Sequence, residues 1–206
     1  MQDQTISGFL EQLAAKVPAP GGGASAALHA AQGAALLGMV ARYSTGEKYA
    51  GDAEAITRIR TEADRLRGRA VELAAEDAAA FTAVTDAYRL PKGTDAEKDA
   101  RGAAIAAASA GAAKPPADTI TLAGHLVGLA EELLPIANRN VVTDVAAAAE
   151  AARAALTTAR VNVEVNLAGV RDGETHAALG GVLGTVDDHV RRAERLTEQV
   201  RAEIAR

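Results

Sequence analysis

The segment from Asp52 to Tyr88, DAEAITRIRTEADRLRGRAVELAAEDAAAFTAVTDAY, is the part of this 206-residue chain that decides the fold class. Its apolar residues mostly recur at steps of three and four, which is the spacing of one face of an α-helix. This stripe consists of Ile56, Ile59, Ala63, Leu66, Ala70, Leu73, Phe81 and Val84. A pattern of this length without a breaker predicts one long helix of a bundle or a coiled-coil-like element.

Two later segments repeat the pattern. In 139–167 the apolar positions are Val142, Val145, Ala149, Ala152, Leu156, Ala159 and Val163. In 174–204 they are Leu179, Val182, Val186, Val190, Ala193, Leu196 and Val200. Breaks in helical structure are expected at 18–23, 45–52, 90–94, 114–116, 134–140 and 171–174. With strand signals almost absent, we predict an all-α fold, a single-domain bundle of long antiparallel helices over residues 1–206.

Composition excludes several classes of protein. The chain is 49% hydrophobic but only 2% aromatic, and its formal net charge of -5 argues against a general nucleic-acid binder. It has no cysteine, which rules out disulfides and thiolate catalysis. Its N-terminus lacks the features of a signal peptide. The best membrane candidate, 24–41, is rich in alanine and contains His29 and Gln32, so we interpret it as a buried helix of a soluble, cytoplasmic protein.

Three consecutive glycines, Gly21, Gly22 and Gly23, stand directly before this alanine-rich helix. They match neither a nucleotide P-loop nor a dinucleotide fingerprint. Glycine amides at a helix start either bind an anion or simply form a flexible linker, and the pattern leaves both interpretations open. Within the helix, a row of small residues four apart indicates close helix packing, in the bundle or between two copies. That row is Ala26, Ala30, Ala34 and Gly38.

Polar residues interrupt the apolar pattern at two places. Asp77 lies in register with the stripe of 52–88, so its carboxylate is either buried at a paired or cavity-lining position or reaches solvent at the edge. One face of 139–167 is polar at both ends, with Asn140 and Asp144 at one end and Asn162 and Asn166 at the other. This face is either a site or an ordinary solvated surface. The four histidines are scattered, so no metal site is expected.

Five segments in order resemble the cyclodeaminase/cyclohydrolase family, which includes methenyltetrahydrofolate cyclohydrolases and the C-terminal domain of formiminotransferase-cyclodeaminase. They are KVPAPGGGASAAL (16–28), MVARYSTGEKY (39–49), DAAAFTAVTDAYRLPK (77–92), NRNVVTDVAAAAEAA (138–152) and NVEVNL (162–167). The resemblance implies an all-helical subunit that forms a homodimer. It also implies a folate site that uses the glycine turn and facing helices.

The resemblance also assigns functional positions. The three glycines match the family's PGGG turn, and Asp77 matches the aspartate of its D-x-x-A-F segment. Tyr88 and Lys92 match A-Y-x-L-P-K. The remaining matches are Asn138 and Asn140 in the G-N-x-N turn, Asp144 after it, and Asn162 and Asn166 in N-V-x-x-N-L. The chain departs from the family pattern at Ala24, Glu47, Ala137 and Thr143, although Ser25 follows Ala24 and offers a hydroxyl.

The implied activity is hydrolysis of 5,10-methenyltetrahydrofolate to 10-formyltetrahydrofolate, with no cofactor beyond the folate substrate. The alternative is a cyclodeaminase that releases ammonia from 5-formiminotetrahydrofolate, and a second alternative is a non-catalytic helical dimer. For either reaction our hypothesis is that Asp144 moves protons and Asp77 supports it or binds the pterin.

The other positions are predicted to hold the substrate. Lys48, Lys92 and Arg139 are candidates for the carboxylates of the folate tail, which includes any polyglutamate extension. The glycine amides are candidates to hold an anionic or carbonyl oxygen, and Asn162 and Asn166 to satisfy the pterin. No nucleic-acid or membrane partner is expected.

Overall fold

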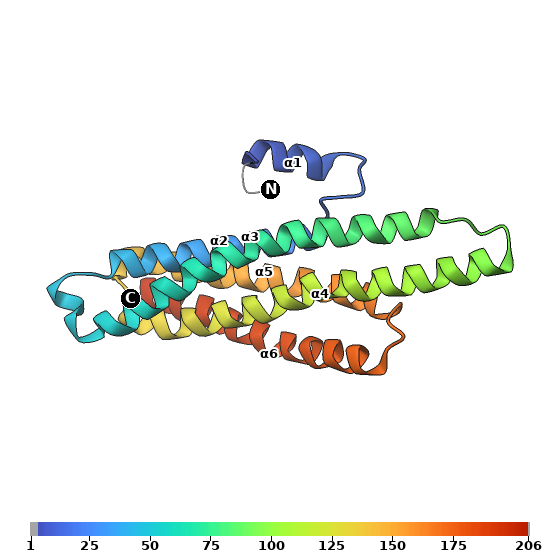
Figure 1. Cartoon of the computed structure of the whole chain (residues 1–206). Helices are drawn as coiled ribbons and strands as arrows, with labels where there is room; N and C mark the ends of the chain where they lie inside the picture. Colours follow the sequence, from blue (N-terminus) through green and yellow to red (C-terminus); the bar gives the residue numbers. More distant parts are fainter. Residues whose placement is uncertain (1–3, 206) are drawn as a thin grey trace.

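The computed structural model describes residues 4–205, in which there are six α-helices and no strand, so the predicted all-α fold is confirmed (Figure 1). The helices are α1 Ile6–Ala14, α2 Gly22–Tyr43, α3 Ala53–Arg89, α4 Asp95–Leu133, α5 Val142–Leu167 and α6 Gly173–Ile204. Three short 3-10 helices lie in the connections: η1 Glu47–Asp52, η2 Leu134–Ile136 and η3 Arg139–Val141.

The helices α2 to α6 form the bundle, in which α2 packs on α3 and α5 while α4 packs on α3, α5 and α6. The helices α2 and α5 are antiparallel, because Gly22 approaches Asn162 whereas Gly33 approaches Ala148. The predicted stripes of α5 and α6 face the core: every stripe residue of α5 is buried, and those of α6 are buried or half-buried. The largest fully buried side chains include Leu37, Ile59, Leu73, Ile120, Leu126, Leu129, Leu133, Leu156 and Leu196.

The row of small residues on α2 packs inside the chain. Ala26, Ala30 and Ala34 are at most 1% exposed, and Gly38 is also buried. A β-carbon on the neighbouring Gly33 would lie 3.1 Å from the carbonyl oxygen of Ala148, so α2 and α5 approach closely. Of the two interpretations left open by the spacing, packing within the bundle is therefore the one that the structure supports.

Within residues 4–205, two helical stretches are long and apolar enough to cross a membrane, Gly22–Tyr43 and Asp95–Ile136. In both, 61% of the apolar window is buried against the rest of the protein. The first contains the segment 24–41, and its burial agrees with the interpretation of that segment as a core helix.

The break expected at 114–116 is wrong, because α4 continues through Pro115 and Pro116. A proline inside a helix removes the amide that would bond the carbonyl four residues earlier, at a cost of about 3 kcal/mol. Here Nδ2 of Asn166, on α5, donates to the carbonyl of Ala112 at 3.4 Å and so replaces the missing amide of Pro116. Gly111, whose carbonyl loses the amide of Pro115, is exposed to water. The hydrogen bond from Asn166 thus outweighs the tendency of proline to break the helix.

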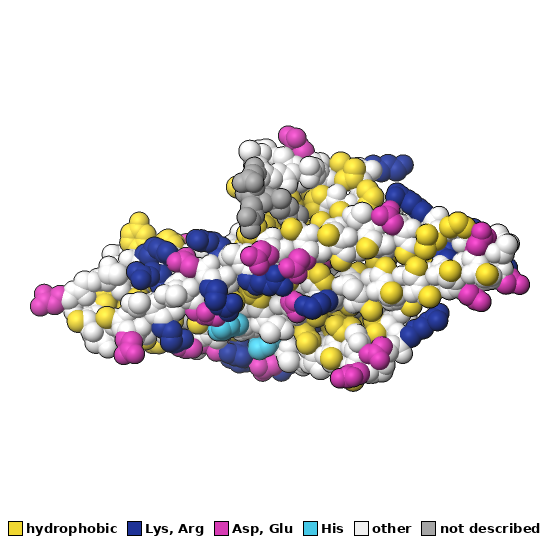
Figure 2. All heavy atoms as spheres, viewed as in Figure 1, with side chains coloured by type: hydrophobic (Ala, Val, Ile, Leu, Met, Phe, Trp, Pro, Cys, Tyr) yellow, Lys and Arg dark blue, Asp and Glu magenta, His cyan; other side chains and the backbone are white. Residues whose placement is uncertain are grey.

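The helices α3 and α4 extend beyond the bundle as a hairpin (Figure 1). The predicted stripe of α3 is buried from Ile56 to Leu73, but Phe81 is 49% exposed. The reason is that α2 begins at Gly22, opposite Asp77, so that α2 does not cover α3 beyond this point, while α4 continues beside it. Apolar atoms accordingly remain visible along this part of the molecule (Figure 2).

The short helix α1 lies outside the bundle (Figure 1). Thr5 caps it by accepting a hydrogen bond from the amide of Gly8 at 3.1 Å. No residue of α1 is buried, and Ile6 is 81% exposed. A helix of nine residues is too short to be stable by itself in water, so α1 depends on whatever packs against its apolar side.

Candidate active site at the start of helix α2

The first turn of α2 is covered by a carboxylate from α3. A β-carbon built on Gly23 would lie 2.0 Å from Oδ1 of Asp77, so only glycine leaves room for this approach. The carboxylate of Asp77 also accepts a hydrogen bond from the backbone amide of Ala24. Gly21, which precedes the helix, has no side chain to cap it, and Asp77 satisfies one of the free amides from the neighbouring helix. The glycine run therefore serves a close approach between two helices.

This environment changes the acidity of the site. Burial raises the pKa of Asp77 above the usual aspartate range, and the hydrogen bond from the Ala24 amide offsets part of that effect. A carboxyl with a raised pKa exchanges protons more readily near neutral pH than an ordinary aspartate. Asp77 is half-buried and its carboxylate accepts a hydrogen bond at a helix start, so of its two interpretations the paired position agrees better with the structure than a carboxylate in solvent.

Two asparagines of α5 complete this side of the bundle. Nδ2 of Asn162 donates to the carbonyl of Thr158 at 2.8 Å, and the same nitrogen lies 3.5 Å from the position of a β-carbon on Gly22. Nδ2 of Asn166 donates to the carbonyl of Asn162 at 2.8 Å as well as to Ala112. Asn162 thus lies at the glycine turn, whereas Asn166, one helical turn later, is hydrogen-bonded to the backbone of Asn162 and connects α5 to α4.

The other polar end of α5 lies far from this site. Asp144 is eighteen residues before Asn162 on one continuous helix, a separation of about 27 Å along the axis. It stands in the first turn of α5, where a negative charge is favourable. Because α2 and α5 are antiparallel, Asp144 lies near the C-terminal end of α2 and Asp77 near its start. One chain alone does not bring the two predicted catalytic aspartates together.

The predicted binding residues near Asp144 are engaged within the protein. Asn138 donates its Nδ2 to the carbonyl of Tyr43 at 2.8 Å, and its Oδ1 accepts from the amide of Asn140 at 3.1 Å. Arg139 forms an ion pair with Glu203. Lys48 lies over the ring of Tyr49, with Nζ 5.5 Å from the ring centre. Asn138 therefore joins the end of α2 to the start of α5.

Tyr88 and Lys92 lie elsewhere again, at the tip of the α3–α4 hairpin. The carbonyl of Tyr88 accepts two hydrogen bonds from the guanidinium of Arg101, at 3.0 and 3.2 Å, and this guanidinium also lies 5.4 Å from the centre of the Tyr88 ring. Both predicted residues are exposed. The thirteen predicted residues thus fall into three groups, of which only Gly21–Gly23, Asp77, Asn162 and Asn166 converge.

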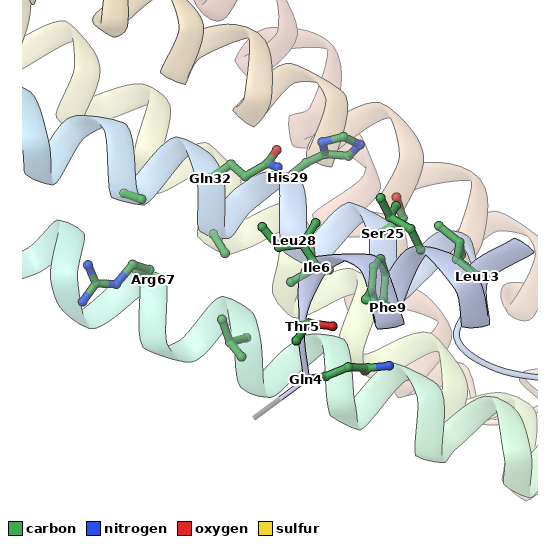
Figure 3. A pocket seen from close by; sticks show the side chains of 14 residues that line it. Gln4, Thr5, Ile6, Phe9, Leu13, Ser25, Leu28, His29, Gln32 and Arg67 are labelled. Atoms are coloured by element: carbon green, nitrogen blue, oxygen red, sulfur yellow. The ribbon is translucent and has the colours of Figure 1, made fainter. Parts of the chain in front are cut away.

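A cavity of about 440 Å³ lies between α1 and the pair α2 and α3, and its lining on α2 starts at Ser25, two residues after Gly23 (Figure 3). Phe9 and Leu13 of α1 line it from one side and Leu28 of α2 lines it from the other (Figure 3). Sequence reasoning did not find these lining residues, because their role depends on where α1 lies. The one available signal was the apolar spacing of Ile6, Phe9, Leu10 and Leu13.

The fold and these contacts define a class of protein: a bundle of long helices with a polar site at the glycine start of one helix, where an acidic side chain from a second helix and an amide from a third converge. The chain belongs to the formiminotransferase-cyclodeaminase family, whose model matches residues 5–181. The family predicted from five sequence segments, and with it an enzyme, is confirmed.

Named relatives agree with this assignment. The chain is 39% identical to a methenyltetrahydrofolate cyclohydrolase of Methylorubrum extorquens over 171 residues, 82% of each protein. It is 30% identical to the formimidoyltransferase-cyclodeaminase of Mus musculus over 186 residues, 88% of this chain but only 34% of the mouse enzyme. A solved structure, the formiminotetrahydrofolate cyclodeaminase of Thermotoga maritima, superposes with a TM-score of 0.83 at 25% identity and covers 97% of this chain and 98% of its own.

Proposed function

We propose that this protein is a methenyltetrahydrofolate cyclohydrolase, which adds water to the methenyl bridge of 5,10-methenyltetrahydrofolate to give 10-formyltetrahydrofolate. The similarity that extends over 82% of both chains to an enzyme of that name supports this choice. The structural observation that carries it is the carboxylate of Asp77 at the start of α2, because the methenyl substrate is a cation and the reaction needs a proton acceptor.

The proposed reaction needs one proton carrier. Asp77 takes a proton from water as the hydroxyl adds to the methenyl carbon. The bond from this carbon to N5 then breaks, and Asp77 returns the proton to N5. The hydroxyl proton leaves to solvent as the formyl group forms on N10. A carboxyl with a raised pKa suits both the acceptance and the return of that proton.

Cyclodeamination is the second candidate, favoured by the names of the mouse relative and of the Thermotoga structure. In that reaction N10 attacks the carbon of the protonated formimino group and gives its proton to the carboxylate of Asp77. The carboxyl passes this proton to the amino group of the tetrahedral carbon, which then expels ammonia and leaves the methenyl cation. Both reactions share a tetrahedral carbon between nitrogens, so the geometry around Asp77 serves either.

We further infer that the protein acts in the cytoplasm as a homodimer, without a membrane or nucleic-acid partner and without a cofactor beyond its folate substrate. In such a dimer Asp144 takes part at the Asp77 site only if it comes from the second copy, since in one chain Asp144 lies about 27 Å along α5 from Asn162, the residue of α5 that reaches this site. Lys48, Lys92 and Arg139, which are predicted to contact the folate tail, would likewise have to come from the second copy, because none of the three converges on Asp77.

The decisive experiment follows the absorbance of methenyltetrahydrofolate with the wild-type protein and with Asp77→Asn. Faster decay with the wild type and a loss of about a hundred-fold or more in the variant are expected. Release of ammonia from 5-formiminotetrahydrofolate, without faster methenyl decay, would transfer the proposal to the cyclodeaminase. Absence of both activities would reject the proposed chemistry.

A further inference from the structure

We propose that the cavity under α1 receives the p-aminobenzoyl-glutamate tail of the folate substrate, with α1 as its cover and Arg67 as the contact for a tail carboxylate. This inference rests on the proposed function, and it assigns a location for the substrate that none of the predicted tail residues provides.

The cavity runs along α2 and α3 away from the Asp77 end of these helices, which is the direction that the tail of a folate reacting at Asp77 requires. Along α2 its lining runs from Ser25, just after Gly23, to Ala35, about 15 Å further on at 1.5 Å per residue. Along α3 it includes Val71 and Arg67, and Arg67 lies ten residues, again about 15 Å, before Asp77. Since α2 and α3 run antiparallel, the order of residues along both helices places Asp77 beyond the Ser25 and Val71 end of the lining and Arg67 toward the other end.

The lining fits an aromatic ring that ends in a carboxylate. Most of the wall is apolar, with Phe9, Leu13, Leu28 and Val71 among the side chains that form it. The cavity of about 440 Å³ lies within the range of ligand sites, which combine apolar walls with a few polar groups. Its polar groups come from Gln4, Thr5, Ser25, His29, Gln32 and Arg67.

Arg67 is available for a ligand anion. Among the described residues that line the cavity, it is the one Lys, Arg, Asp or Glu side chain. Its own ion contact, from Nη1 to Asp64, is 3.5 Å long, whereas the carboxylate of Asp64 is bound at 2.5 Å by Arg42. The guanidinium of Arg67 therefore keeps donors for a carboxylate, and charge complementarity favours the anionic tail over an apolar helix as the occupant.

The state of α1 also agrees with a ligand beneath it. This helix buries none of its residues, yet Phe9 and Leu13 point into the cavity (Figure 3). An aromatic ring bound between α1 and Leu28 would supply the packing surface that a nine-residue helix lacks. Binding of the tail and ordering of α1 are then one event.

The test uses the full chain, which contains no tryptophan, so a single introduced tryptophan reports its own surroundings. Phe9→Trp places the reporter in the cavity, and Ile204→Trp at the exposed end of α6 is the control. The probes are p-aminobenzoyl-glutamate and 5-formyltetrahydrofolate. Both are expected to shift the emission of Phe9→Trp saturably and to leave that of Ile204→Trp unchanged.

Substitution of the anion contact gives a second readout. Arg67→Ala is expected to raise KM for methenyltetrahydrofolate about ten-fold with kcat unchanged, since a hydrogen bond to a charged group is lost. The same change in the Phe9→Trp background should weaken binding of p-aminobenzoyl-glutamate equally. Arg65→Ala, which removes an exposed arginine outside the cavity, is the matched control and should leave KM within two-fold, about the limit of a surface pair.

The outcomes separate the two proposals. Normal hydrolysis with an unchanged KM in Arg67→Ala and a silent Phe9→Trp would overturn the tail site and leave the cyclohydrolase intact. An emission of Phe9→Trp that depends on protein concentration but not on folate would overturn it too and identify a second copy as the occupant. A saturable response to the tail fragment without hydrolysis would support the site and reject the proposed function.

Discussion

Gly23 and Asp77 are matched to one another across two helices: a β-carbon at position 23 would lie 2.0 Å from Oδ1 of Asp77. The neighbouring glycines have more room. A β-carbon on Gly22 would be 3.5 Å from Nδ2 of Asn162, and one on Gly21 would meet nothing within 4 Å. The three consecutive glycines therefore differ in how much space each would leave for a side chain.

Gly23→Ala is expected to displace the Asp77 carboxylate and to lower kcat/KM about a hundred-fold, the range of a lost proton carrier. Gly21→Ala is the matched control, because its φ of -138° suits alanine and the space around it is open. It should keep activity within a few-fold. Equal losses in both variants, with circular dichroism unchanged, would contradict a specific fit between Gly23 and Asp77.

The raised pKa of Asp77 predicts the acid side of the pH profile. If the ionised carboxylate accepts the proton from water, kcat/KM should fall as pH drops through a range above that of an ordinary aspartate, because burial favours the protonated form. The measurement is the pH dependence of methenyl decay, corrected for the spontaneous reaction. An acid limb at the ordinary aspartate value would assign the proton transfer to another group.

The same burial predicts a cost in stability. A carboxyl whose pKa is higher in the folded than in the unfolded protein destabilises the fold as pH rises from the unfolded value through the folded one, and the cost is complete above the latter. Asp77→Asn removes this cost. At neutral pH the variant is expected to melt at the same temperature as the wild type or up to about 3 °C higher, although it is inactive. A large loss of stability would show that the carboxylate is needed for folding.

Asn166 is expected to stabilise the fold through the proline in α4. Asn166→Ala leaves the carbonyl of Ala112 without its donor and should cost about 1–3 kcal/mol in free energy of unfolding. In the background of Pro116→Ala, the restored amide can bond this carbonyl, so the same change should cost clearly less. A double-mutant cycle by urea denaturation measures the coupling, and additive costs would rule out this role for the bond.

Mixing two inactive variants tests whether two copies of the chain form the site together, with Asp77 from one copy and Asp144 from the other. If Asp144 of one copy serves Asp77 of the other, Asp77→Asn and Asp144→Asn proteins should each be inactive alone. Refolded together, they should regain about a quarter of the wild-type activity, because a mixed dimer has one intact site. Wild-type activity in Asp144→Asn would remove this residue from the chemistry and leave its charge at the start of α5 as its role.

The fold was predictable because its signals are local. The apolar stripes of α5 and α6, the absence of strands from the part of the chain that the structure describes, and most breaks between helices follow from helix periodicity, alanine content, glycine and proline. The polar interruptions at Asp77 and Asn162 were visible for the same reason. Both lie where a helix would otherwise present apolar or small residues to its neighbours.

The sequence by itself determined the fold class, the helix faces and the family of this protein. Only the tertiary structure decided which polar residues meet, because this depends on the relative lengths and offsets of helices rather than on any one pattern. The start of α2 opposite Asp77 creates the site and leaves Phe81 exposed, and the antiparallel course of α5 separates Asp144 from it. Likewise Asn166, distant in sequence, lets Pro116 remain inside a helix.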